Sequence, residues 1–121
     1  MDLVIRPLVG PEVVTGSTRL KAGTATKLVL NAITTIAMVQ LGKVYENLMV
    51  DMRASNAKLR DRAIRIICAV TGATREQAAE LLRQADGHVK TAIVMHAKGV
   101  GRDEAEQKLQ GKRGSLRDAL K

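Results

Sequence analysis

The junction at residues 10–27 constrains this chain most, because a segment broken by glycine and proline turns there into a long apolar stretch. Gly16 permits a positive φ and therefore a sharp turn of the backbone. Around it lie hydroxyls that can cap a helix and cations that fall in the expected first helical turn. These residues are Thr15, Ser17, Thr18, Arg19 and Lys21. The pattern predicts a loop that leads into a helix N-terminus.

A helix N-terminus of this composition is suited to holding an anion. The first turn leaves backbone N–H groups without intrahelical partners, and the aligned peptide dipoles place partial positive charge there. Cations at this end are unfavourable by roughly 0.3–1 kcal/mol each when exposed, and a bound anion would remove that penalty. The alternative is that Thr15 or Ser17 simply caps the helix and that Arg19 and Lys21 point into solvent. Taken alone, these residues favour the alternative.

A long helix is predicted from about Thr18 to Leu41, with Gly42 as its C-terminal cap. Its apolar residues recur at helical spacing, and further apolar residues lie on its other faces, so we expect it to be buried on several sides. The main stripe consists of Ala25, Leu28, Val29, Ala32, Ile33, Ile36 and Val39. Self-association through this helix is the expected way to cover a face that has no partner.

Regular helical periodicity resumes at Ser55-Asn56 and predicts an all-α C-terminal half. One apolar stripe ends at Gly72 and consists of Leu59, Ala63, Ile66, Ile67 and Val70. Thr74 with Gln77 then forms a capping box for the next helix. Val89, Ala92, Ile93 and Ala97 form another stripe that ends at Gly99. Residues 102–109 and 115–120 read as two further short helices of thin apolar content, and we expect the terminus to fray.

Two segments have no clear helical period. Residues 3–9 contain a short β-branched run, a single weak strand that cannot satisfy its own backbone groups, so we expect residues 1–14 to be disordered or to pair with another chain. Residues 43–54 carry Glu46 and Asp51, which could serve as an acid or base near a site. The simpler interpretation, an ordered connector with exposed carboxylates, is favoured because neither acid is paired with a second catalytic group.

Composition narrows the classes of partner. The net charge is +8, of which residues 54–121 carry +6, but acidic residues are interspersed with the basic ones and no aromatic residue interleaves with them. The pattern therefore disfavours nucleic-acid binding. Cys68 stands alone and is expected to be a buried thiol, and His88 and His96 are poorly spaced for a metal. No apolar run is judged long enough to span a membrane, so we expect a cytoplasmic location. We expect no cofactor.

The junction resembles the signature shared by N-acetylmuramic acid 6-phosphate etherases and the glucokinase regulatory protein, both of the sugar-isomerase superfamily. The resemblance is carried by Gly10-Pro11-Glu12, by residues 15–24, by residues 43–51 and 56–59, and by residues 89–95, Val-Lys-Thr-Ala-Ile-Val-Met. It covers nearly the whole chain and is closer to the etherases. Relatives are more than twice as long, however, and this chain corresponds to their C-terminal part.

The resemblance implies a division of roles. Residues 1–53 would be the end of a phosphosugar-binding α/β domain, including its last strand, and residues 54–121 a small bundle similar to ubiquitin-associated domains. Thr15, Gly16, Ser17, Thr18, Arg19 and Lys21 would border the anionic sugar site. The family's two catalytic glutamates lie upstream, so no catalytic residue and no metal ligand is expected here. The implied function is the C-terminal part of an etherase; the alternative is a non-catalytic regulatory or protein- or nucleic-acid-binding module.

Overall fold

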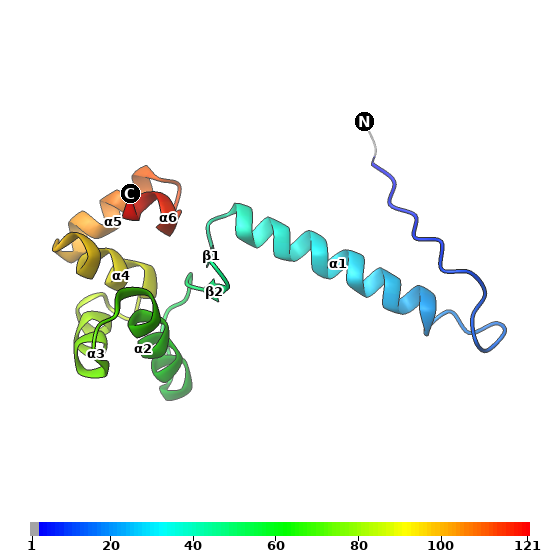
Figure 1. Ribbon diagram of the computed structural model, residues 1–121, viewed down its shortest axis with the longest axis horizontal. Coiled ribbons are helices and arrows are strands. Elements are labelled where there is room, and N and C mark those ends of the chain that lie inside the picture. The colour runs from blue at the N-terminus through cyan, green and yellow to red at the C-terminus, as the bar shows by residue number, and fades with distance from the viewer. Residues whose placement is uncertain (1–2) are drawn as a thin grey trace. The chain divides into compact units, whose positions relative to one another are not determined.

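The computed structural model describes residues 3–121, and helices dominate it (Figure 1). The long helix α1 spans Lys21–Gln40 and is followed by two very short strands, β1 (Val44–Tyr45) and β2 (Leu48–Met49). Five shorter helices complete the chain: α2 (Ala57–Thr71), α3 (Arg75–Gln84), α4 (Val89–Lys98), α5 (Arg102–Gly111) and α6 (Leu116–Leu120). The predicted all-α class is confirmed.

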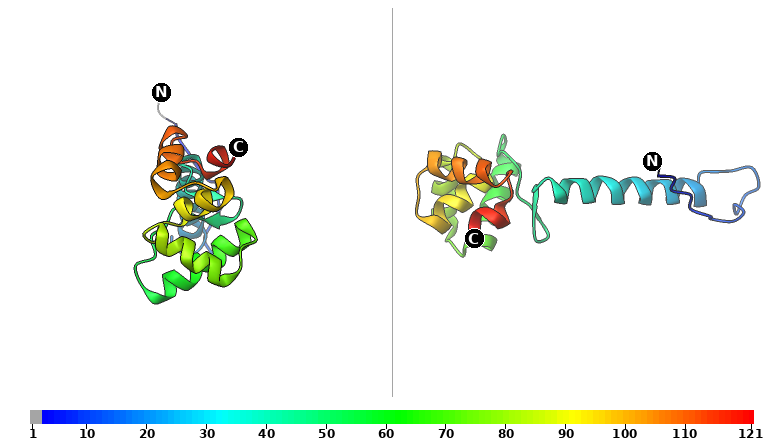
Figure 2. Two further views of the ribbon diagram at one scale, coloured as in Figure 1. Left: turned by 90° about the vertical axis from the view of Figure 1, so that its left-hand side faces the viewer. Right: turned by 90° about the horizontal axis from the view of Figure 1, so that it is seen from above.

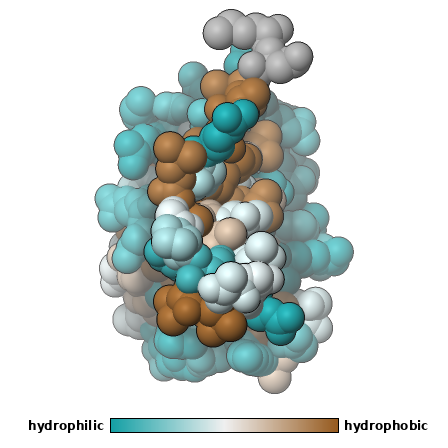
Figure 3. Space-filling model, turned by 90° about the vertical axis from the view of Figure 1, so that its right-hand side faces the viewer, coloured by the Kyte–Doolittle hydropathy of each residue, from teal (hydrophilic) through white to brown (hydrophobic). Residues whose placement is uncertain are grey.

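The chain divides into two compact units, Met1–Ala37 and Met38–Lys121, and the division falls within the last turn of α1. In the first unit, α1 has no buried residue although it is rich in leucine, isoleucine and valine. Figure 3 looks onto this end of the chain and shows brown, apolar side chains standing at its surface. We expected α1 to be buried on several sides, but no segment among the described residues covers it.

Length and composition allow α1 to cross a membrane. It has 20 residues and a mean hydropathy of 1.3 in its most apolar window, so the expectation that no apolar run reaches spanning length is wrong for this helix. Core helices of soluble proteins meet the same criterion, and α1 carries Lys21, Lys27 and Asn31 within its length. Its composition equally fits a helix made to pack against protein.

In the second unit, residues 43–54 form an ordered connector, as the simpler interpretation of the sequence predicted. Gly42 has a φ of +69° at the end of α1, as predicted for a C-terminal cap. Val44 and Tyr45 then pair antiparallel with Met49 and Leu48 around a two-residue turn. Val50, which follows this hairpin, is completely buried in the core of the bundle. The connector is thus a hairpin joined to the bundle.

Local caps set the ends of α2 and α3. The Asn56 side chain accepts a hydrogen bond from the Leu59 N–H at 2.8 Å, and Gly72 ends α2 with a φ of +72°. Thr74 and Gln77 form the predicted capping box: the Gln77 N–H donates to the Thr74 hydroxyl, and the Thr74 N–H donates to the Gln77 side-chain oxygen. Gly99 likewise ends α4 in the left-handed region, with a φ of +63°. These boundaries were predictable because each depends on residues only a few positions apart.

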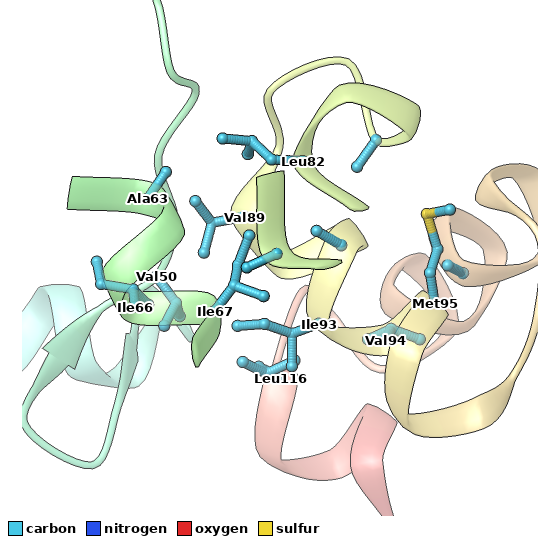
Figure 4. Packing of buried hydrophobic residues seen from close by; sticks show 14 of the residues in the cluster. Val50, Ala63, Ile66, Ile67, Leu82, Val89, Ile93, Val94, Met95 and Leu116 are labelled. Carbon is cyan, nitrogen blue, oxygen red and sulfur yellow. The ribbon is translucent and has the colours of Figure 1, made fainter. Parts of the chain in front are cut away.

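The core is organised around α4, which lies between α2 and α3 on one side and α5 and α6 on the other (Figures 1 and 2). Most of α4 is buried, namely Val89, Thr91, Ala92, Ile93, Val94 and Met95. In Figure 4, Ile67 of α2, Ile93 of α4 and Leu116 of α6 lie together. The apolar side chains that fill this core are aliphatic, apart from Met95.

Four expectations about the second unit need correction. Ala97, assigned to the stripe of α4, is exposed, whereas Ile64, left out of the stripe of α2, is buried. Cys68 is only partly buried. The chain terminus was expected to fray, but α6 packs on α4 through Leu116 and Ala119, which are 1% and 6% exposed. A short helix with two apolar residues can be secured when both face a preformed core.

Candidate functional site

The N-terminus of α1 is capped by a carboxylate from outside the helix. The Glu12 side chain accepts hydrogen bonds from the N–H groups of Lys21 at 2.9 Å and Ala22 at 3.0 Å. The Lys21 ammonium donates to the carbonyl of Pro11 at 2.9 Å, on the same loop. The helix therefore begins at Lys21, three residues later than predicted, and an anion does occupy its positive end. That anion belongs to the chain itself.

The predicted hydroxyl residues occupy the loop before this cap. Gly16 has a φ of +85°, and the Ser17 N–H donates to the Val14 carbonyl at 3.0 Å, which closes a turn. Thr18 contributes its carbonyl, which accepts from the Gly23 N–H at 3.0 Å. The alternative in which Thr15 or Ser17 caps α1 is wrong, because Glu12 accepts the relevant N–H groups.

The side chains around the turn remain available to solvent. Thr15, Thr18 and Arg19 are exposed, Ser17 is partly buried, and none of these side chains hydrogen-bonds to another residue in the described range 3–121. The structure thus places Thr15, Gly16, Ser17, Thr18 and Arg19 in one loop beside the helix end. Their assignment to an anionic sugar site stays a prediction.

Electrostatics explain why Glu12 suits the cap. Hydrogen bonds from the backbone N–H groups of Lys21 and Ala22 hold the pKa of the Glu12 carboxyl below its ordinary value of 4.5. Sequence reasoning missed this role because Glu12 lies nine residues before Lys21. The available signal was Gly10-Pro11, where Gly10 has a φ of +68° and the chain begins to turn back toward α1.

Protonation of Glu12 is expected to fray α1. A carboxyl whose pKa is depressed in the folded state contributes stability above its unfolded pKa, and this contribution is lost as pH falls through the folded value, here below 4.5. At pH 7, Glu12→Ala should reproduce the loss by raising amide hydrogen exchange at Lys21 and Ala22. Glu46→Ala, which removes an exposed carboxylate elsewhere, is the control. Unchanged exchange in Glu12→Ala would contradict the cap.

The two connector acids have different surroundings. Glu46 lies in the hairpin turn with a φ of +52°. Asp51 is held by Lys43 at 2.9 Å and Lys90 at 2.8 Å. Partial burial raises the pKa of Asp51, but the hydrogen bonds from Lys90 and Lys43 outweigh that effect and lower it. An aspartate engaged by two ammonium groups serves as an anchor, which supports the interpretation of an ordered connector.

Over residues 3–121, no group of three or more histidine, cysteine, aspartate or glutamate side chains is placed to hold a metal ion. His88 is the N-cap position of α4 and His96 lies in its last turn.

Comparison of the sequence with known protein families first identifies a class of domain. Residues 46–87, from the hairpin turn through α3, match the family described as the C-terminal lid domain of glucokinase regulatory protein. This match begins inside the connector, and the predicted domain boundary at residue 53 stays a prediction.

Full-length relatives then identify the family. The N-acetylmuramic acid 6-phosphate etherases of Yersinia pestis (strain Pestoides F) and Yersinia pseudotuberculosis serotype O:1b (strain IP 31758) are each 57% identical to this chain over 119 residues. The matched region is 98% of this chain and 40% of each relative. The chain belongs to the family of N-acetylmuramic acid 6-phosphate etherases, corresponds to their C-terminal part, and spans about two fifths of the length of these relatives.

Proposed function

We propose that this chain provides the C-terminal part of an N-acetylmuramic acid 6-phosphate etherase, a cytoplasmic enzyme of cell-wall amino-sugar recycling that works without a cofactor. The observation that carries the proposal is 57% identity sustained over 98% of the chain to proteins of that name. The reaction splits the lactyl ether by elimination and addition of water, which yields N-acetylglucosamine 6-phosphate and D-lactate. The acid and base for these steps would come from the upstream part.

In this proposal the loop at residues 15–21 borders the phosphosugar. Thr15, Ser17 and Thr18 offer hydroxyl donors, and Arg19 offers a guanidinium that no described residue engages. They lie beside a helix end whose own N–H groups are held by Glu12. A phosphate here would be bound by side chains instead of by the first turn of α1. In an intact etherase, replacing the residues equivalent to Arg19 and Lys21 together should weaken phosphosugar binding, and unchanged affinity would refute the placement.

The decisive assay is release of D-lactate from N-acetylmuramic acid 6-phosphate. We expect the purified chain to release none above background, while a full-length etherase under the same conditions does. Adding the separately produced upstream part of an etherase should restore release if the two parts associate. Release by the chain alone would overturn the assignment of the acid and base to the upstream part and would direct attention to Glu12, Glu46 and Asp51.

We also propose that the isolated chain forms a homo-oligomer through α1, because this helix exposes Leu28, Ile33, Ile36 and Val39 and buries nothing. Ile33→Glu should weaken association by about a hundredfold, since burying an isoleucine contributes about 2–3 kcal/mol. Asn31→Glu adds the same charge on the opposite side of the helix and should have little effect. Light scattering over a concentration series measures both, and a monomeric wild-type chain would contradict the proposal.

A second candidate is a non-catalytic module that responds to a phosphosugar and regulates a partner. The match of residues 46–87 to the lid domain of a regulatory protein favours it. If this is correct, the chain should bind a protein partner without adding to etherase activity. Nucleic acid is disfavoured as a partner; duplex binding that falls steeply with salt would reverse that view.

A further inference from the structure

The second unit contains a cavity that has no role in the proposed function, and none of the residues that line it belongs to the junction at residues 10–27. Its volume is about 650 Å³, and its walls come from three segments: residues 50–53 of the connector, residues 88–91 at the start of α4, and one side of α5. In Figure 1, α4 and α5 are neighbours along the chain and in space. The cavity is therefore formed within one unit, so its geometry does not depend on how the two units are arranged.

The first turn of α4 has backbone donors that are not used. His88 is the N-cap residue, and its side chain makes no capping hydrogen bond. The Val89 N–H donates to Met52 at 3.3 Å and the Ala92 N–H donates to His88 at 3.0 Å, but the N–H groups of Lys90 and Thr91 have no acceptor among residues 3–121. By contrast, side chains cap α2 and α3.

Thr91 provides a second, independent observation. It is 5% exposed and is the one polar residue of the described core, yet its hydroxyl has no hydrogen-bond partner in residues 3–121. No fully buried side-chain nitrogen or oxygen in that range is left unpaired, so the Thr91 hydroxyl keeps some accessible surface, and Thr91 is one of the residues that line the cavity. A buried residue that keeps a polar atom free toward a cavity is typical of a ligand contact.

The charges of the walls favour an anion. Arg53, Lys90 and Arg102 line the cavity together with the carboxylates of Asp51 and Glu106. Outside the lining, Asp86 lies near both arginines and Lys43 contacts Asp51, which leaves four cations against three carboxylates. Lys90 is engaged by Asp51, but Arg53 pairs with Asp86 at 2.8 Å through side chains that are 62% and 50% exposed. Exposed pairs of this kind contribute little stability, so Arg53 can turn toward a ligand with little loss of free energy. Arg102, bonded to Glu106, has similar freedom.

We propose that this cavity binds a small oxyanion of the phosphate class at the N-terminus of α4. Two backbone N–H groups and one hydroxyl present three donors, which matches the three terminal oxygens of a phosphate ester. The positive end of the helix dipole adds a favourable field. The site lies within residues 50–110, outside the junction at residues 10–27. The result of its test therefore does not depend on whether the etherase assignment is correct.

The test is a titration of the whole chain with sodium phosphate, followed by amide chemical shifts at constant ionic strength. The amides of Lys90 and Thr91 should shift saturably, while that of Gln77, already bonded to Thr74, should not. Thr91→Val keeps the shape of the side chain and removes the hydroxyl, and it should weaken phosphate binding about tenfold. Thr26→Val, which removes an exposed hydroxyl on α1, should leave the affinity unchanged. Parallel arms with glucose 6-phosphate and acetate distinguish a phosphate ester from a simple carboxylate.

A second variant keeps the proposal testable if Thr91→Val fails to fold. His88→Asp supplies a capping carboxylate within the chain. The amides of Lys90 and Thr91 should then show shifted positions before any ligand is added, and saturable phosphate binding should disappear. Shifts that spread over the basic surface without saturation, that persist unchanged in Thr91→Val and His88→Asp, or that favour acetate over phosphate would overturn the proposal.

Discussion

Ile93→Ala is expected to lower the free energy of unfolding of the second unit by about 3–4 kcal/mol. Ile93 is completely buried on α4, where helices from both halves of the bundle meet. The loss combines the transfer free energy of the removed carbons with that of the cavity left behind. The surrounding core has no phenylalanine or tryptophan, and its short aliphatic side chains have little reach to fill that space.

Urea unfolding followed by circular dichroism measures this effect. Met49→Ala removes a side chain of similar size at a position that is 47% exposed, and it should change the unfolding free energy by less than about 0.5 kcal/mol. If both variants lost the same amount, or if Ile93→Ala lost less than about 1 kcal/mol, Ile93 would not lie at the centre of the core.

Lys90→Met is expected to release the connector from the bundle and to lower stability by about 2 kcal/mol. The Lys90 side chain is only 13% exposed, and its ammonium donates to Asp51 at 2.8 Å, to the Gly114 carbonyl at 2.9 Å and to the Gly42 carbonyl at 3.3 Å. One side chain therefore joins the connector, α4 and the loop before α6. Methionine keeps much of the apolar stem but removes the ammonium from all three acceptors, of which Asp51 keeps Lys43 as a partner.

Close packing of the backbone adds to this attachment. A Cβ placed on Gly42 would lie 3.1 Å from the Gly114 carbonyl oxygen, and the φ of Gly42 is +69°. Both the conformation and the contact require glycine there. Lys90 thus bridges two backbone segments that already touch.

Hydrogen exchange distinguishes release of the connector from general destabilisation. The N–H groups of Val50 and Asp51 bond to the Lys43 carbonyl at 3.1 and 3.3 Å, and that of Ala54 bonds to Gly87 at 2.9 Å. In Lys90→Met these amides should exchange faster, while amides in the middle of α2 keep most of their protection. Lys98→Met, on an exposed position of the same helix, is the matched control. Equal exchange in the two variants would show that Lys90 does not hold the connector.

Sequence reasoning succeeded where the determinants are close together in the chain. The capping box of Thr74 and Gln77 and the glycines at positions 72 and 99 define helix ends within a few residues, and the structure has them as predicted. Periodicity likewise identified Ala63, Ile66 and Ile67 as core residues of α2. The family was identifiable from the junction and the motifs that follow it because they extend along nearly the whole chain.

Sequence reasoning failed where residues meet only through the fold. Leu116 had too few apolar neighbours to be recognised as a core residue, and its burial depends on α4 lying beneath it. Asp51 could have been an acid or base by its position in the sequence, but its two lysine partners come from the start of the connector and from α4. No local pattern predicts such a cluster.

The sequence by itself determined the helical class, most helix ends and the kinship with N-acetylmuramic acid 6-phosphate etherases, because these depend on short-range periodicity, caps and motifs. Only the tertiary structure decided that Glu12 caps α1, that Lys90 contacts the connector and that Thr91 lines a cavity. The physical reason is distance along the chain. Hydrogen bonds between residues 9 to 48 positions apart form only after the backbone has folded, and either partner alone looks like an ordinary polar residue.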